Sequence, residues 1–182
     1  MITLRTEEEK DYKKVFEIVE QAFKILEYSD HQEHFLVEKL RKSHNFIPEL
    51  SIVADFVNDD TGEKDLVGHI LFTKISIESN SESFESLALA PVSVKPEYQN
   101  QGIGGHLIAF GHLVAQEMGY KSVVLVGHEK YYPKFGYIKA SKFGITFPFD
   151  VSEENGMAIE LVDNGLKNIK GIVKYPKEFG IE

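Results

Sequence analysis

The chain has 182 residues, of which 42% are apolar and 27% are charged, the composition of an ordinary globular protein. This length predicts a single domain over residues 1–182. A net charge of −9 argues against nucleic acid as a partner, and the absence of cysteine excludes a disulfide framework and a thiolate nucleophile. No secretory signal is apparent and no apolar run approaches the roughly 20 residues that span a bilayer, so we expect a cytoplasmic protein without a membrane partner.

The first part of the chain has the pattern of one strand followed by two helices. Apolar residues at alternate positions predict a strand over residues 1–5. Apolar residues three and four positions apart predict a helix over residues 7–26, with Thr6 as its N-cap and glutamates in its first turn. A second helix is predicted over residues 30–42. Three of its side chains are expected to face inward: Phe35, Leu36 and Leu40.

Strands dominate the middle of the chain. Residues 50–57 and 66–77 predict a hairpin, because a segment rich in Asn, Asp and Gly separates them. A polar turn is predicted over residues 80–85, and residues 86–94 then form the next strand, antiparallel to the one before. Pro91 cannot donate a ladder hydrogen bond, so it predicts a bulge or a local opening of the sheet within that strand.

A helix and further strands follow. The helix after the glycine-rich loop is predicted to end at Gly119 and to bury one face, made of Leu107, Ile108, Gly111, Val114, Ala115 and Met118. The apolar run at residues 122–126 predicts a buried strand parallel to the preceding one, which makes a right-handed crossover. A short helix is predicted over residues 131–135. Strands are then predicted at residues 137–138, 157–162 and 171–175.

The loop between the strand that ends at Val94 and the next helix is the most informative segment. A glycine-rich loop at a helix N-terminus favours phosphate, because the first N–H groups lack helical partners and no Cβ atoms block the approach. A P-loop is excluded because His106 and Leu107 stand where Lys and Ser or Thr are needed. A dinucleotide fingerprint fits Gly102 and Gly104 but lacks the third glycine.

The segment from Val92 to Gly105 resembles the acetyl-CoA-binding motif of the GNAT superfamily of N-acetyltransferases. That motif, Q/R-x-x-G-x-G/A, is matched by Gln99, Gly102 and Gly104. The later run Tyr131-Tyr132-Pro133-Lys134-Phe135-Gly136-Tyr137 resembles the second signature of the family, Y-x-x-x-G-F/Y. The resemblance is firm over residues 66–137, and the tail resembles a branch of acetyltransferases without an assigned substrate.

The resemblance implies an α/β fold with a mixed, mostly antiparallel central sheet that splays at the acetyl-CoA site and is flanked by helices. It also implies a core over residues 1–140, with further strands and loops over residues 141–182. Acetyl-CoA would be the cosubstrate, with no metal, and its pantetheine arm would lie along Val92, Ser93 and Val94. The pyrophosphate would be held by the N–H groups of Asn100, Gln101, Gly102, Ile103, Gly104 and Gly105, and Gln99 of the motif would also belong to the cofactor-binding residues.

Acetyl transfer also requires groups that move protons. The resemblance implies that Tyr132 is the general acid, since a phenol with a pKa of about 10 can protonate a departing thiolate. For Tyr131 we favour a packing role. The carboxylate that many members carry on the strand at residues 122–126 is missing. The general base is therefore open among His128, Glu129, Glu85 and a water chain.

The acceptor is expected to be a primary amine of a small molecule or a protein. By resemblance, residues 22–44 and 141–156 form the acceptor cleft. The second segment has apolar residues suited to a pocket or to a homodimer interface, namely Phe143, Phe147, Pro148 and Phe149. Two other functions stay open: a non-catalytic acyl-CoA-binding module on the same fold, and a nucleotide-binding protein that shares only the glycine loop.

Overall fold

The computed structural model describes residues 1–27, 29–80 and 82–181. Tyr28, Ser81 and Glu182, which fall in the predicted acceptor segment, the predicted polar turn and the predicted domain end, lie outside the described residues. Contacts divide the chain into two compact units: unit 1 has residues 1–72 and 90–111, and unit 2 has residues 73–89 and 112–182. The single domain over residues 1–182 stays a prediction.

Three elements pass from one unit into the other. They are β3 (Lys64–Ser79), β4 (Glu82–Val94) and α3 (Ile103–Glu117). The structure confirms that the strands predicted at residues 50–57, 66–77 and 86–94 are neighbours, because β3 lies between β2 and β4 in the sheet. The observed strands are longer than predicted, since β3 continues to Ser79 and β4 already begins at Glu82.

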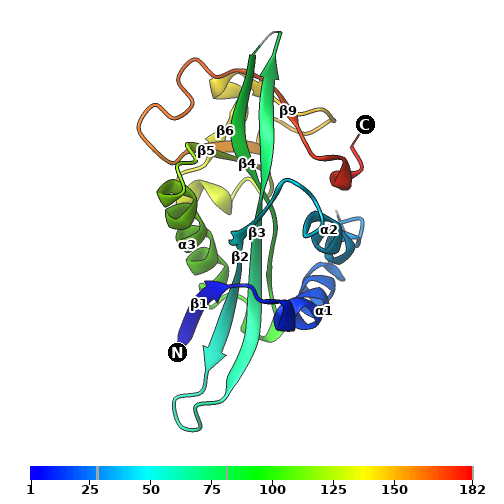
Figure 1. Ribbon diagram of the computed structural model, residues 1–182, viewed down its shortest axis with the longest axis vertical. Coiled ribbons are helices and arrows are strands. Elements are labelled where there is room, and N and C mark those ends of the chain that lie inside the picture. The colour runs from blue at the N-terminus through cyan, green and yellow to red at the C-terminus, as the bar shows by residue number, and fades with distance from the viewer. Residues whose placement is uncertain (28, 81, 182) are drawn as a thin grey trace. The chain divides into compact units, whose positions relative to one another are not determined.

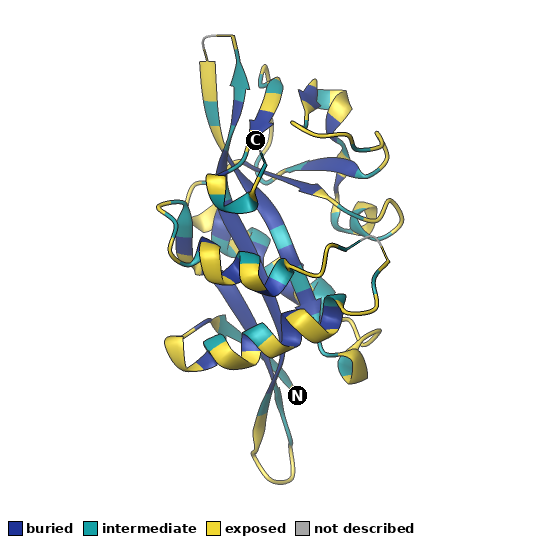
Figure 2. Cartoon of the chain, turned by 90° about the vertical axis from the view of Figure 1, so that its right-hand side faces the viewer, coloured by how far each residue is buried: buried dark blue, intermediate teal, exposed yellow. Residues whose placement is uncertain are grey.

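In unit 1, two helices pack side by side on a sheet. Strand β1 (Ile2–Thr6) runs antiparallel to β2 (Phe46–Val57), and the ladder joins Ile2 to Phe56 and Thr6 to Ile52. Helices α1 (Tyr12–Phe23) and α2 (Glu33–Leu40) lie against each other (Figure 1). Their outer faces are exposed while the strands beneath them are buried (Figure 2), as expected for amphipathic helices.

Two predictions about these helices are wrong. Thr6 is not an N-cap, because it pairs with Ile52 as the last residue of β1. A short 3-10 helix (Glu9–Asp11) comes first instead, and the Glu8 N–H donates to the Asp11 carboxylate at 2.9 Å. In α2 the buried residues are His34, Val37 and Leu40, whereas Phe35 is 42% exposed and Leu36 is half-buried.

Unit 2 contains the remaining short strands. They are β5 (Ser122–Val126), β6 (Ile138–Lys139), β7 (Ile145–Thr146), β8 (Gly156–Glu160) and β9 (Gly171–Lys174). The predicted strand at residues 122–126 is confirmed, and β5 runs parallel to β4 and antiparallel to β8. Strand β9 pairs with the end of β3, and β7, which the sequence pattern missed, pairs with β9.

The core of unit 2 is built mainly from small aliphatic side chains. Its buried members include Ile75, Ile77, Ala88, Val124, Ala158 and Val173. Phenylalanine and tyrosine side chains pack around this cluster, among them Phe84, Phe143, Phe147 and Tyr175. Gly119, with a φ of 90°, follows α3 as predicted, but Met118 is 43% exposed and does not belong to the buried face. Among the described residues, no helix combines the length and the apolar character needed to cross a membrane.

Candidate functional site

The glycine-rich loop lies in unit 1 at the N-terminus of α3. The peptide bond between Ala90 and Pro91 is cis, and β4 continues to Val94 before a 3-10 turn (Pro96–Tyr98). The ladder that joins β4 to β5 pairs Leu87 with Val123 and Ala88 with Val124, so it ends before Pro91. This agrees with the expectation that Pro91 marks the point where regular pairing is lost.

Side chains and backbone conformation shape this loop. Asn100 and Gly102 have left-handed φ values of 60° and 83°. The Gln99 side-chain amide donates to the carbonyl of Val94 at 3.1 Å, and that of Gln101 donates to the carbonyl of Glu97 at 3.2 Å. Both glutamines therefore brace the loop with their side chains.

The start of α3 presents backbone donors. The first helical hydrogen bond runs from the His106 N–H to the Gly102 carbonyl at 3.0 Å, so the N–H groups of Ile103, Gly104 and Gly105 precede it. Ile103 is buried and anchors the helix, whereas Gly104 and Gly105 are only half-buried. The geometry is that of an anion-binding helix N-terminus.

Gly68 on β3 allows this helix to lie close to the sheet. A Cβ atom at Gly68 would lie 3.1 Å from the Leu107 side chain, 3.3 Å from the Ile103 side chain and 3.3 Å from the Ser93 carbonyl. Ser93 itself is 2% exposed between the half-buried Val92 and Val94, and its hydroxyl has no hydrogen-bond partner within the described part of the chain. The predicted pantetheine strand thus contains an unsatisfied buried hydroxyl.

Tyr132 lies in unit 2, at the start of a 3-10 helix (Tyr132–Phe135) that ends at Gly136 with a φ of 98°. The half-buried Tyr132 ring meets the Tyr131 ring edge-on at 5.1 Å and the Tyr137 ring at 5.8 Å. The favoured packing role of Tyr131 agrees with its ring contacts to Tyr132 and Phe135 and with the Lys134 ammonium 4.0 Å from its centroid.

The buried Tyr137, whose ring contacts Tyr132, forms a hydrogen-bonded pair with the half-buried His112. The Tyr137 hydroxyl lies 2.8 Å from Nε2 of His112. Burial raises the pKa of Tyr137 well above its usual value, and the charge of Tyr132 raises it further. Burial lowers the pKa of His112 to about 4, so the imidazole is neutral near pH 7. Tyr137 is thus a neutral phenol that fixes one side of the Tyr132 ring.

Two residues that the sequence did not single out hold the other side of this ring. A Cβ atom at Gly127 would lie 2.2 Å from Cε2 of Tyr132, so the ring rests directly on the glycine backbone. Asn155 fixes that backbone from both sides: its carbonyl accepts from the Gly127 N–H at 3.0 Å, and its side-chain amide donates to the Gly127 carbonyl at 2.9 Å. Residue spacing cannot show this contact, because 28 positions separate the partners.

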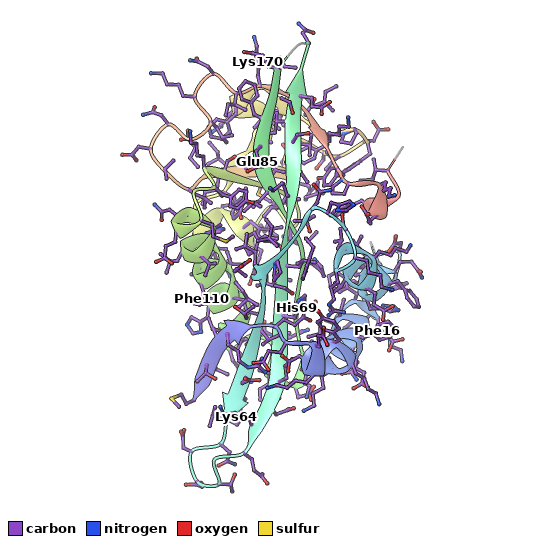
Figure 3. All side chains as sticks on the ribbon, in the orientation of Figure 1. Phe16, Lys64, His69, Glu85, Phe110 and Lys170 are labelled. Atoms are coloured by element: carbon purple, nitrogen blue, oxygen red, sulfur yellow. The ribbon has the colours of Figure 1, made fainter. Side chains whose placement is uncertain are left out.

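The candidate bases differ in their surroundings. His128 and Glu129 are exposed on the loop that follows β5, and Nδ1 of His128 accepts from the Lys130 N–H at 3.2 Å. Glu85, labelled on β4 in Figure 3, pairs with the Lys74 ammonium at 3.2 Å. This contact raises the pKa of Lys74. Within the described residues, no group of three or more His, Asp or Glu side chains is arranged to hold a metal ion.

The two predicted acceptor segments lie in different units. In residues 22–44 of unit 1, the buried His34 ring packs against Phe16 and Phe35 at 4.6 and 4.3 Å. In residues 141–156 of unit 2, the aromatic side chains border a pocket that is described below.

Comparison with known proteins identifies the family. A family model described as "Acetyltransferase (GNAT) domain" matches residues 3–140. The chain is 32% identical to the uncharacterized N-acetyltransferase YjhQ of Escherichia coli K12, over 84% of this chain and 79% of that protein. It is 27% identical to the uncharacterized N-acetyltransferase YhbS of the same strain, over 71% and 74% of the two chains.

Solved structures agree with this match. A GNAT family acetyltransferase from Brucella melitensis in complex with acetyl-CoA is 28% identical, with a TM-score of 0.76 and 98% of both chains covered. The YhbS protein from Escherichia coli in complex with CoA has a TM-score of 0.84 at 23% identity, over 98% of this chain and 92% of that chain, and shows the same fold. Both the fold class and the family resemblance are confirmed: this chain belongs to the GNAT family of acetyltransferases.

Proposed function

We propose that the protein is an acetyl-CoA-dependent N-acetyltransferase that transfers an acetyl group to a primary amine by direct attack in a ternary complex. The observation that carries the proposal is the N-terminus of α3, where the N–H groups of Ile103, Gly104 and Gly105 precede the first helical hydrogen bond. The acetyl-CoA bound by the Brucella protein and the CoA bound by YhbS support the same cosubstrate.

In this proposal the donor is held mainly by backbone groups. Val92, Ser93 and Val94 line the pantetheine and acetyl arm, and the loop from Asn100 to Gly105 binds the pyrophosphate through its N–H groups. The side-chain hydrogen bonds of Gln99 and Gln101 support this proposal, because they hold the loop backbone in place. Preorganised donors of this kind bind an anion without a further cost of ordering.

The reaction forms one bond and breaks one. The lone pair of the neutral amine attacks the thioester carbonyl carbon, so a C–N bond forms as the C–S bond breaks. Tyr132 gives its phenolic proton to the departing thiolate, and the proton lost by the amine goes to His128, Glu129, Glu85 or a water chain. Since the sequence contains no cysteine, no acyl-thiol intermediate is available.

A calorimetric titration of acetyl-CoA tests this proposal. We expect saturable binding to the wild type and none to Gly104→Glu, because the new carboxylate repels the pyrophosphate. The control is Ala109→Glu, which adds the same charge at an exposed position of α3. No binding to the wild type at millimolar acetyl-CoA, or undiminished binding to Gly104→Glu, would overturn the proposal. ATP and NAD should not compete, which separates it from a nucleotide-binding protein.

A second candidate function is a non-catalytic acyl-CoA-binding module. It is favoured by β5 (Ser122–Val126), which carries no carboxylate, and by the pairing of Glu85 with Lys74. CoA release with a panel of primary amines distinguishes the two functions. Turnover that Tyr132→Phe reduces supports the enzyme, whereas binding of acetyl-CoA without turnover of any amine supports the module.

A further inference from the structure

Unit 2 contains a pocket of about 280 Å³ that the predicted donor site does not use. The 3-10 helix Ala140–Phe143, the segment after β7 and the start of β8 line it, and it is open to solvent on one side. Its volume is just below the range for ligand sites, roughly 300 to 1,000 Å³, so it suits only a small molecule.

Two phenyl rings, together with the aliphatic Ala140, Ile145 and Val151, form the apolar part of this pocket. The Phe147 and Phe149 rings lie 5.9 Å apart at 39°, and Phe149 is 38% exposed. Gly156 on β8 makes room for the first ring, because a Cβ atom there would lie 2.6 Å from Cε2 of Phe147. The rings therefore present an accessible π surface to whatever enters the pocket.

The polar part of the pocket is acidic. Asp150 and Glu153 both line it, and no Lys, Arg or His is among the described residues that do so. Glu153 accepts from the Ser141 hydroxyl at 2.6 Å and also faces the Lys139 ammonium at 3.6 Å. In the described part of the chain, no hydrogen bond or ion pair involves Asp150. Asp150 is thus the carboxylate that can take a cationic ligand.

From this combination we infer that the pocket binds a small organic ammonium ion with an aromatic or aliphatic body. The body packs on Phe147 and Phe149, and the ammonium group lies beside Asp150. A neutral or anionic molecule of the same shape can pack on the rings, but it gains no attraction from the negative charge of Asp150. The inference rests on the proposed function in one respect only: if acetyl transfer is confirmed, this ammonium compound, once deprotonated, is the acceptor amine.

Binding of 2-phenylethylammonium chloride to the whole protein, without acetyl-CoA, tests the inference by saturation-transfer NMR and calorimetry. The neutral 2-phenylethanol and the anionic phenylacetate are the matched probes. The variants are Asp150→Asn, which removes only the charge, and Phe147→Leu, which removes a ring. Asp163→Asn is the control, because Asp163 lines a different, polar depression of unit 2 that has no aromatic residue among its described lining.

We expect saturable binding of the ammonium ion, about fivefold weaker binding to Asp150→Asn, and weaker binding to Phe147→Leu. Asp163→Asn should bind like the wild type, and phenylacetate should not bind. The inference is overturned if the ammonium ion does not saturate the protein, if phenylacetate binds equally well, or if both Asp→Asn variants weaken binding alike. Thermal melts confirm that each variant is folded at the temperature of the titration.

The same variants separate this inference from the proposed function. If the ammonium ion binds as expected but no amine is acetylated, the pocket stands and the proposed enzymatic function fails. If amines are acetylated with a KM that Asp150→Asn does not change, and the titration shows no saturable binding, the transferase stands and the pocket inference fails.

Discussion

At the scale of single residues, Gly127 and Tyr132 form a contact that leaves no room for a side chain at position 127. We predict that Gly127→Ala lowers kcat about tenfold or more while the KM for acetyl-CoA stays unchanged. The added methyl group would lie 2.2 Å from the Tyr132 ring and must displace it. If Tyr132 is the general acid, as we propose, a small displacement of its hydroxyl is costly in rate. Steady-state kinetics of CoA release measures both constants.

The effect should depend on the Tyr132 hydroxyl. In a Tyr132→Phe background, Gly127→Ala should cause no further loss of kcat, because the proposed proton donor is already absent. Gly111→Ala is the control for fold damage, since its methyl group would meet the Phe72 ring at the same distance, 2.2 Å. Two outcomes would contradict a positioning role of Gly127 toward Tyr132. One is that Gly127→Ala lowers kcat equally in the wild type and in Tyr132→Phe. The other is that Gly111→Ala lowers kcat as much as Gly127→Ala does.

At the scale of elements, the end of α2 is fastened to the sheet of unit 1 by a buried ion pair. Arg41, directly after α2, contacts the Glu7 carboxylate at 2.5 Å, and their side chains are 6% and 1% exposed. The Ser51 hydroxyl donates to the same carboxylate at 2.7 Å, and the Tyr12 ring lies 4.0 Å from the guanidinium. Helix α2 is thereby tied to both β2 and the start of α1.

We predict that Arg41→Met lowers the free energy of unfolding by about 3–5 kcal/mol, because it leaves the Glu7 carboxylate buried without its counterion. Lys39→Met, at an exposed position of α2, should change it by less than about 0.5 kcal/mol. Urea unfolding followed by circular dichroism measures both. Adding Glu7→Gln to Arg41→Met should restore part of the loss, and failure to do so would point to lost packing as the cause.

Element types could be read from the sequence more readily than the faces that they bury. Strand β5 has the predicted bounds because its apolar run is continuous. In α2, four apolar residues fall within six positions, so periodicity alone cannot choose the buried face. The Phe16 ring contacts both His34 and Phe35, yet His34 is buried and Phe35 is 42% exposed. The glycine loop was readable because its motif is local. The Gly127–Asn155 contact was not, because it depends on pairing between β5 and β8.

At the scale of the whole molecule, each unit has, among its described residues, one histidine whose pKa is lowered to about 4 by burial: the buried His69 in unit 1 and the half-buried His112 in unit 2. His69, labelled on β3 in Figure 3, is fully buried, with Nε2 3.0 Å from the Ser51 hydroxyl. That hydroxyl donates to Glu7, so it accepts from the Nε2–H of a neutral ring. Both imidazoles are neutral in the native state near pH 7.

This arrangement predicts a loss of stability on mild acidification. In the unfolded chain both histidines become protonated near pH 6.5, but in the native state they do so only near pH 4. The stability that the two neutral imidazoles contribute is therefore complete above pH 6.5 and is lost as the pH falls from 6.5 to 4. Between pH 6.5 and pH 5 each histidine should account for roughly 2 kcal/mol. Urea unfolding of the wild type, His69→Gln and His112→Gln at pH 7 and pH 5 measures these differences.

The same experiment tests whether the two units unfold together. Because β3, β4 and α3 each pass from one unit into the other, we expect one cooperative transition, to which both histidines contribute. Each single variant should then remove about half of the histidine-dependent loss, and the double variant nearly all of it. Two separate transitions, each with a pH dependence that only one of the variants changes, would show that the units are independent and that the predicted single domain is wrong.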